Sequence, residues 1–313
     1  MITPVSVVYD DIFLLHDLPG HPESAVRLRA ITERLASDPG LNALPFATPP
    51  DVDPSLLRSV HTESHILAVQ RTAESGGGWL DGDTYCTPRS YDVAIRAAGA
   101  AMQGASMVMG GEARSVFALV RPPGHHATPS QPMGFCLFNN AAVAVRTAQR
   151  LHGAERIAVV DIDVHHGNGT QDVFYEDPSV LYCSLHQWPL YPGTGLQRET
   201  GEGRGEGTTV NVPLPPKTDG EQWLHAFDAR VAPAVRAHRP DMLVVSAGYD
   251  AHEADPLAQL RLTTDTYAQA TTRLASLAGE LCAGRMLWVL EGGYDLDALG
   301  ASVAASLLAL EAA

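Results

Sequence analysis

Short runs of mainly apolar, often β-branched residues alternate along the chain with longer segments whose apolar positions recur at helical spacing. A short continuous apolar run predicts a strand buried on both faces, and apolar residues at every third or fourth position predict an amphipathic helix. We expect strands at 5–8, 115–120, 157–163, 180–185, 208–212, 242–246 and 286–290. We expect helices at about 21–38, 62–74, 89–109, 140–153, 221–238, 265–283 and 296–311. Alternation of this kind predicts a parallel sheet with helices on both faces.

Polar clusters follow five of these strands directly. They are RPPGHH (121–126), DIDVHH (161–166), SLH (184–186), GYD (248–250) and EGGY (291–294). In an open parallel sheet the carboxyl ends of the strands lie at one edge, and ligands bind there. We therefore expect the five clusters to meet in one crevice. The sequence shows no repeat, low-complexity tract or linker, so we predict a single α/β domain over 1–313.

The cluster at 161–166 places two kinds of metal-ligating side chain on one side of the backbone. In an extended chain alternate residues share a face, so Asp161, Asp163 and His165 point the same way. A carboxylate and an imidazole placed like this can converge on a metal ion. The structural alternative is a buried aspartate pair held by hydrogen bonds, with the histidines capping the next helix. Several buried charges without a metal or partners would be costly, which favours the functional interpretation.

Asp250 is the best candidate for a third metal ligand. Ala247 and Gly248 can turn the chain at the end of the strand and point this carboxylate inward. A lone Asp after glycine is often only a turn residue, but its place at the shared sheet edge favours ligation. Two carboxylates and one imidazole suit zinc and also tolerate iron(II) or cobalt(II). Such a metal would ease the deprotonation of water and polarise a carbonyl, which is the chemistry of amide or ester hydrolysis.

His125 and His126 are neighbours, so their side chains diverge and both are not expected to reach one metal. Gly124 permits a turn that brings both rings into the crevice, where a general base and an electrostatic helper are more plausible roles. The alternative is a structural histidine pair. Tyr294, after Gly292 and Gly293, could aim its hydroxyl at a developing oxyanion, although a Tyr after two glycines is often just packed.

Composition narrows the classes of partner and compartment. The 313 residues are 45% hydrophobic and 18% charged, with a net charge of −15, which suits a soluble globular enzyme. This charge argues against nucleic acid or an anionic membrane as the main partner; it could attract basic peptides, although many soluble proteins are simply acidic. We see no secretion signal and no run of the ~18–20 apolar residues that a membrane helix needs. The four cysteines lack CxxC spacing and are expected to be reduced thiols in a cytoplasmic protein.

Taken together, the motifs resemble those of the histone deacetylase family, which includes bacterial deacetylase-like amidohydrolases, acetylpolyamine amidohydrolases and acetoin-utilisation proteins. The motifs are RPPGHH (121–126), GFCLFNN (134–140), DIDVHHGNGT (161–170), YPGTG (191–195), SAGYDAHEADP (246–256) and EGGY (291–294), with weaker likeness at HPESAVR (21–27) and DGDT (81–84). The resemblance implies an arginase-like α/β sandwich, with a mainly parallel sheet between two helical layers. It also implies a zinc-dependent hydrolase of N-acyl-lysine in proteins or peptides.

The resemblance assigns roles to individual residues. It implies zinc ligands at Asp163, His165 and Asp250, a general base at His126, and an electrostatic partner, His125, oriented by Asp161. It implies an oxyanion donor at Tyr294. The substrate channel and its rim would use Gly134, Phe135, Tyr191, Gly293, Leu257 and Asp83, and Arg27 would lie near an acetate exit pocket.

The family also carries monovalent cation sites, which the resemblance places at two positions. A potassium site near the metal would use Asp161, the Ser184 hydroxyl and main-chain oxygens of Asp163, His165 and Leu185. A second site would use main-chain oxygens around Phe174, Asp177, Val180 and Thr208. Otherwise Ser184 and Phe174 would be ordinary strand-end and helix residues.

Two positions separate this chain from some relatives. Asn168 stands where some members have aspartate, so His126 should be easier to keep neutral at pH 7. Leu257 stands where polyamine-selective relatives carry an acidic gate, which favours acyl-lysine over acetylpolyamines. An acetylpolyamine or small-amide hydrolase and a non-catalytic reader of acyl-lysine remain alternatives; a binuclear manganese enzyme would need more ligands than these motifs provide.

Overall fold

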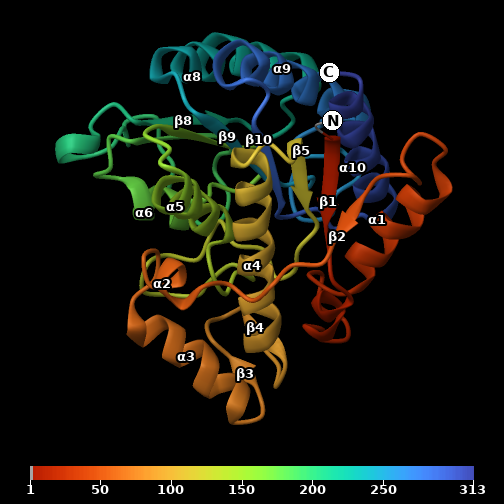
Figure 1. Ribbon diagram of the computed structural model, residues 1–313, viewed down its shortest axis with the longest axis vertical. Helices are drawn as coiled ribbons and strands as arrows, with labels where there is room; N and C mark the ends of the chain where they lie inside the picture. Colours follow the sequence, from red (N-terminus) through yellow and green to blue (C-terminus); the bar gives the residue numbers. More distant parts are fainter. Residues whose placement is uncertain (1–2) are drawn as a thin grey trace.

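The computed structural model describes residues 3–313; residues 1 and 2, part of the predicted 1–313 domain, lie outside it. Its centre is a sheet of eight parallel strands in the order β2-β1-β5-β10-β9-β6-β7-β8 (Figure 1). The strands are β1 (Thr3–Val8), β2 (Phe46–Ala47), β5 (Ala113–Ala118), β6 (Ile157–Asp161), β7 (Val180–Gln187), β8 (Thr209–Leu214), β9 (Met242–Ala247) and β10 (Met286–Leu290). A separate antiparallel hairpin joins β3 (Gly78–Trp79) and β4 (Tyr85–Cys86).

Helices cover both faces of this sheet, as the alternating pattern predicts. The helices are α1 (Val26–Ser37), α2 (Pro54–Leu57), α3 (Glu63–Glu74), α4 (Ser90–Met109), α5 (Asn140–His152), α6 (Asn168–Phe174), α7 (Gly220–Ala226), α8 (Ala232–His238), α9 (Thr264–Cys282) and α10 (Leu296–Glu311). On one face α10 packs between α1 and α9, and on the other face α4 packs against α5 (Figure 1). Among residues 3–313, no helix has the length and apolarity needed to cross a bilayer.

The central strands are buried along their whole length, as continuous apolar runs predict. Every residue of β6, β7, β9 and β10 is buried. Neighbouring strands β6 and β9 pair in register, with Asp161 opposite Ser246. The carboxyl ends of β9, β6 and β10 therefore lie side by side in the middle of the sheet, although the chain reaches them far apart in sequence.

The expected strand 157–163 ends two residues early, at Asp161. The Asp161 carboxylate accepts a hydrogen bond from the backbone N–H of Asp163 at 3.2 Å, so a side chain competes with the strand ladder there. The chain bends at this point, yet Asp163 and His165 still bring their side chains together.

Two helices also differ from expectation. The helix expected from residue 21 begins at Val26, because Glu23 turns inward to the Arg121 guanidinium and Asp17 accepts a hydrogen bond from the Ala25 N–H. The single helix expected over 221–238 is interrupted by a wider π-helical turn at Phe227–Val231. Pro233 follows this turn, and the N–H that proline lacks cannot continue the regular ladder.

Candidate active site and metal centre

Nine of the predicted catalytic, metal-binding and channel residues line one cavity of about 200 Å³ at the carboxyl edge of the sheet. Its wall includes His125, His126, His165 and Tyr294, which three separate clusters of the sequence supply. A larger groove of about 760 Å³ beside α3 and α4 contains none of these side chains. The smaller cavity is the one that carries candidate chemistry.

Asp163, His165 and Asp250 form a compact group whose possible ligand atoms all lie within 4.8 Å of one another. The His165 Nδ1 atom is 3.1 Å from Asp163 Oδ1 and 3.2 Å from Asp250 Oδ2. Backbone N–H groups hold the outer oxygens: Gly292 donates to Asp163 Oδ2 and Val164 to Asp250 Oδ1, each at 2.9 Å. The three side chains are thus fixed in orientation and directed at one point.

This group fits a divalent cation. Asp250 Oδ2 is buried and accepts no hydrogen bond from any group in residues 3–313. Burial and the nearby charge of Asp163 raise the pKa of Asp250, because ionising both carboxylates would put an excess of negative charge into the pocket. A cation bound by two carboxylates and one imidazole would remove that excess, and this donor set is one that zinc accepts.

Gly292 leaves the space that such a cation and its ligands need. A Cβ atom at this position would collide with Asp250 Oδ2 and lie 2.6 Å from Asp163 Oδ2. Gly292 also lines the cavity, whereas the predicted Gly293 does not appear in its wall and instead gives its carbonyl oxygen to the Arg27 guanidinium at 2.6 Å. Gly293 has φ +121° and faces Tyr249 and Leu299, so its expected place in the substrate channel stays a prediction.

His125 and His126 lie together beside the metal group, with ring centroids 4.0 Å apart. His125 Nδ1 contacts Asp161 Oδ2 at 3.0 Å, while His126 Nδ1 contacts Asn168 Oδ1 at 2.8 Å. A neutral amide oxygen only accepts, so His126 carries its proton on Nδ1 and presents an unprotonated Nε2. The pair therefore has one carboxylate partner and one amide partner.

These partners separate the pKa values of the two imidazoles. Burial alone would lower the pKa of His125, but the charges of Asp161 and Asp163 outweigh burial and raise it well above the usual value. Burial and the neighbouring His125 lower the pKa of His126 well below its usual value. One ring is charged and the other neutral, which is the arrangement of an electrostatic group beside a base.

Tyr294 lies at the edge of the same cavity, with its ring centroid 6.0 Å from that of Phe135. Burial raises the pKa of its phenol well above the usual value, so the hydroxyl keeps its proton and can donate. The Asp255 carboxylate accepts from the Tyr294 backbone N–H at 2.7 Å, and the Arg27 guanidinium lies 5.0 Å from the ring centroid. Arg27 is fully buried and also bonds the Glu291 carbonyl, so it holds the loop that carries Tyr294.

The other predicted channel residues line the same cavity. Tyr191 stands edge-on to the His126 ring with centroids 5.1 Å apart, and Phe135 lines the cavity edge-on to Tyr294. Gly134 has φ +57°, and a Cβ atom there would meet the His126 ring at 2.5 Å. Leu257 and Asp83 complete the lining of the cavity, and both are half-buried.

The residues of each expected monovalent cation site also lie close together. Asp161 and Ser184 face each other across β6 and β7, and the Ser184 hydroxyl contacts His186 Nδ1 at 2.9 Å. Leu185 follows Ser184 in the same buried strand. The residues of the second group lie around the turn between α6 and β7: Asp177 N–H donates to Phe174 O, Val180 N–H donates to Asp177 O, and the Thr208 carbonyl accepts from Tyr182 N–H.

Two carboxylates that support the site were not assigned a role from sequence, although both lie in quoted motifs. Glu291 Oε2 accepts from the backbone N–H groups of Gly124 and His125, at 2.7 and 3.1 Å, and so fixes the histidine loop. Asp255 holds the backbone of Tyr294. The available signal was that each carboxylate sits within a cluster at the sheet's carboxyl edge. A second group, His125, Cys136 and Glu291, also has close ligand atoms, but burial raises the pKa of the Cys136 thiol well above its usual value and keeps it protonated.

The fold and the site define a class of α/β protein. Its members have a candidate metal centre at the carboxyl ends of the central strands, with one charged and one neutral histidine beside it. Comparison with known families shows a match to the histone deacetylase domain over residues 21–310. The crystal structure of the HDA15 HD domain superimposes with a TM-score of 0.93 at 39% identity, covering 99% of this chain and 88% of that one.

Relatives from a plant, a bacterium and an archaeon are similar to this chain over most of its length. The chain is 43% identical over 309 residues to the chloroplastic histone deacetylase 10 of Oryza sativa subsp. japonica, covering 92% of this chain and 69% of the relative. It is 41% identical over 279 residues to a histone deacetylase-like amidohydrolase of Pseudomonas aeruginosa, covering 88% and 73%. It is 40% identical over 294 residues to a probable deacetylase of Archaeoglobus fulgidus, covering 93% and 81%. The chain belongs to the histone deacetylase family, has the arginase/deacetylase fold, and is a hydrolase of that family.

Proposed function

We propose that this hydrolase removes acetyl or other short acyl groups from the side-chain amine of N-acyl-lysine in proteins or peptides. The observation that carries the proposal is the group Asp163, His165 and Asp250 beside a neutral His126, at the base of a narrow cavity. Zinc is the proposed metal, with iron(II) or cobalt(II) as substitutes. When bound, it would supply Lewis-acid polarisation of the acyl carbonyl and make a water molecule easier to deprotonate.

The protein's own groups supply the proton transfers. His126 Nε2, unprotonated because Nδ1 donates to Asn168, accepts a proton from the attacking water and later gives it to the leaving amine. His125, held charged by Asp161, stabilises negative charge that develops nearby. The Tyr294 hydroxyl donates to the oxyanion. The roles proposed for His126, His125 and Tyr294 are those that the sequence motifs imply.

The walls of the cavity support a slender, uncharged stem as substrate. Phe135 and Tyr191 present aromatic surface on either side of the way to His126, and Leu257 adds an apolar rim. Leu257 cannot attract a second ammonium group, which favours acyl-lysine over acetylpolyamines. Asp83 at the rim is the proposed acceptor for the substrate main chain. An acetylpolyamine or other small-amide deacetylase is the alternative.

Two further parts of the proposal concern ions and location. We propose that Asp161, Ser184 and Leu185, with main-chain oxygens of Asp163 and His165, bind potassium. We propose a weaker monovalent site at Phe174, Asp177, Val180 and Thr208. All four cysteines are free and buried, which supports a reducing compartment such as the cytoplasm.

A turnover panel on the purified, zinc-loaded protein tests the function. Acetyl-lysine and longer acyl-lysine peptides should be hydrolysed with higher kcat/KM than acetylputrescine. Chelation should abolish turnover, and zinc should restore it in the wild type but not in Asp250→Ala. Faster turnover of acetylputrescine would reject the substrate assignment, and full activity of chelated Asp250→Ala would reject the metal-dependent mechanism.

A further inference from the structure

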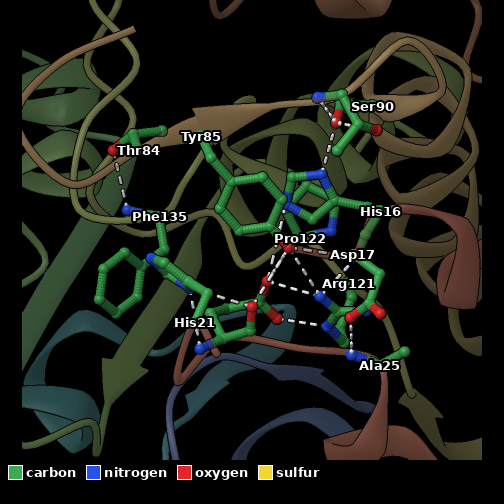
Figure 2. Close-up of polar contacts among 12 residues, drawn as sticks. His16, Asp17, His21, Ala25, Thr84, Tyr85, Ser90, Arg121, Pro122 and Phe135 are labelled. Atoms are coloured by element: carbon green, nitrogen blue, oxygen red, sulfur yellow. Dashed lines mark hydrogen bonds and ion pairs between the residues drawn. The ribbon is translucent and has the colours of Figure 1, made fainter. Parts of the chain in front are cut away.

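Thr84 joins the rim of the channel to its wall through a chain of two hydrogen bonds. The backbone N–H of Phe135 donates to Thr84 Oγ1 at 3.0 Å, and the Thr84 hydroxyl donates to Asp83 Oδ1 at 3.2 Å. Figure 2 shows the first of these bonds, with Thr84 in the rim loop and Phe135 beneath it. Thr84 is fully buried, so its hydroxyl makes these contacts without competition from solvent.

Phe135 needs this support because its backbone is in the left-handed region, with φ +68°. A bulky residue there is strained, and such strain persists only where the surroundings fix it. Met133 and Cys136 close the turn through two backbone hydrogen bonds of 3.2 and 3.0 Å. The N–H of Phe135 points away from that turn and is held by a side chain from a different segment.

His21 supports the same junction from below. Its ring stands edge-on to both Phe135 and Tyr85, with centroids 4.7 Å apart in each case. Its Nε2 atom lies 3.2 Å from the Asp83 carbonyl oxygen, while Nδ1 lies 3.1 Å from the Glu23 N–H. Through these contacts the His21 ring joins the rim loop at Asp83 to the segment at Glu23.

A buried ion pair lies next to Tyr85 and supports the same junction. Arg121 pairs with Glu23, which is fully buried, and also donates to the Tyr85 hydroxyl at 3.1 Å (Figure 2). Tyr85 in turn stacks on His16 with centroids 4.2 Å apart. The carbonyl oxygens of Phe13 and His16 accept further hydrogen bonds from the guanidinium. The junction of Thr84, Asp83 and Phe135 therefore rests on a buried support that several hydrogen bonds hold together.

We propose that Thr84 is a positioning residue for peptide substrates, which fixes the rim carboxylate of Asp83 and the channel wall at Phe135 in one arrangement. Thr84 touches neither the reacting atoms nor the substrate; it acts through these two neighbours. The inference rests on the proposed function, because Asp83 is taken there as the acceptor for the substrate main chain. It predicts that Thr84 favours acyl-lysine within a peptide over the isolated acyl-lysine residue.

The test compares Thr84→Val, which keeps the shape and removes the hydroxyl, with Thr84→Ser, which keeps the hydroxyl. Thr271→Val is the matched control, since Thr271 is equally buried and bonds only a carbonyl of its own helix α9. The loss of one buried hydrogen bond corresponds to roughly a tenfold change. In Thr84→Val we expect KM for an acetyl-lysine peptide to rise about tenfold with kcat within about threefold. KM for Nε-acetyl-lysine should rise by less than about threefold, because the free residue meets the loosened wall at Phe135 but lacks the peptide main chain that Asp83 accepts from. Thr84→Ser and Thr271→Val should keep the wild-type values.

Hydrogen exchange supplies a readout independent of activity. The amide of Phe135 should exchange faster in Thr84→Val than in Thr84→Ser or Thr271→Val, while the amides of β6 and β9 keep their protection. Unchanged KM and unchanged Phe135 exchange in Thr84→Val would overturn the inference. Equal rises in KM for the peptide and for Nε-acetyl-lysine would also overturn it. A wild-type enzyme that leaves acetyl-lysine peptides intact would instead reject the proposed function, and the exchange result would then still judge the Thr84–Phe135 contact.

Discussion

Asn168 gives His126 a neutral hydrogen-bond acceptor, while the adjacent His125 has the carboxylate of Asp161. Burial lowers the pKa of both imidazoles, but the charges of Asp161 and Asp163 outweigh it at His125, whereas burial and the neighbouring His125 keep the pKa of His126 well below its usual value. A base must be unprotonated to accept a proton, so kcat/KM should rise with pH through the pKa of His126. A neutral side chain at position 168 therefore leaves the acidic limit of activity low.

Asn168→Asp tests this assignment. A carboxylate beside Nδ1 favours the charged imidazole and raises the pKa of His126, so the acidic limb of the kcat/KM profile should move to higher pH by about one to two units. Asn168→Ala removes the acceptor without adding charge and should not move the limb upward. An acidic limb in Asn168→Asp that coincides with that of the wild type would refute the role of His126 as the titrating base.

Tyr294→Phe removes a single hydroxyl and keeps the ring packed against Phe135 and Arg27. If the hydroxyl donates to the oxyanion only in the transition state, kcat should fall about 10²- to 10³-fold while KM changes little. Steady-state kinetics on an acetyl-lysine peptide give both constants, and an unchanged Tm shows that the fold is intact. A fall in kcat of less than about threefold would assign Tyr294 to packing instead.

The regular elements could be predicted because their signals are local. The apolar strands and the amphipathic helices on both sides of the sheet follow from periodicity, and the structure confirms the parallel architecture. The start of α1 could not be predicted, because Glu23 fits helical spacing but turns inward to Arg121, almost a hundred positions later in the chain. The hairpin β3–β4 and the short α6 were missed for a related reason, since their few residues depend on distant contacts such as Tyr85 with Arg121.

Some residues of the candidate site could likewise be predicted from the sequence, and others could not. Asp163, His165 and Asp250 could be placed together because each follows the end of a central strand, and the structure brings them within 4.8 Å. Thr84, Asp255 and Glu291 could not be given roles, because their partners are backbone N–H groups of segments elsewhere in the chain. Side-chain type predicts a metal ligand, whereas it does not tell which distant backbone a hydroxyl or carboxylate holds.

The Glu199 carboxylate fixes the loop that carries Tyr191 through hydrogen bonds to its backbone. Its carboxylate accepts from the backbone N–H groups of Gly195 and Leu196, each at 3.0 Å, and from the side chain of Gln171 at 2.9 Å. Three N–H donors on one carboxylate make a strong clamp at the base of the loop. The position of the aromatic wall at Tyr191 should depend on it.

Glu199→Ala should therefore loosen this wall without touching the catalytic groups. We expect KM for acyl-lysine peptides to rise at least about fivefold, with kcat nearly unchanged, because charge-assisted hydrogen bonds each contribute about 1.5–3 kcal/mol. Glu202→Ala, at an exposed carboxylate of the same loop region, is the control and should keep the wild-type KM. Equal KM values for the two variants would show that Glu199 does not position the wall.

Across the whole molecule, buried neutral histidines link stability to pH. Burial lowers the pKa of His16 and that of His61 to about 3. His61 uses both ring nitrogens as a neutral side chain, with Nδ1 2.9 Å from the Thr128 carbonyl and Nε2 accepting from the Asn139 N–H at 2.8 Å. Protonation would turn that acceptor into a donor facing another donor.

The sign of the effect follows from proton binding. Below the ordinary histidine pKa of about 6.5 the unfolded chain binds protons that the folded chain excludes, so the free energy of unfolding should fall as pH drops from 6.5 toward 4, by up to about 1.4 kcal/mol per pH unit for each such histidine. Urea unfolding at several pH values measures this slope. His61→Gln should be less stable at pH 7.5 but have a shallower slope, and His152→Gln, at an exposed histidine, should keep the wild-type slope. A pH-independent unfolding free energy over this range would contradict the prediction.

Because every strand of the sheet runs the same way, the connections that enter strands lie along the edge opposite the site. α4, α5 and α9 end at exposed residues just before β5, β6 and β10: Gly110, Gly153 and Ala283. Exposed turns of this kind tolerate added sequence well. A fluorescent reporter or affinity handle grafted into one of them would sit a full strand length from the chemistry, which makes this edge the natural attachment point for surface immobilisation.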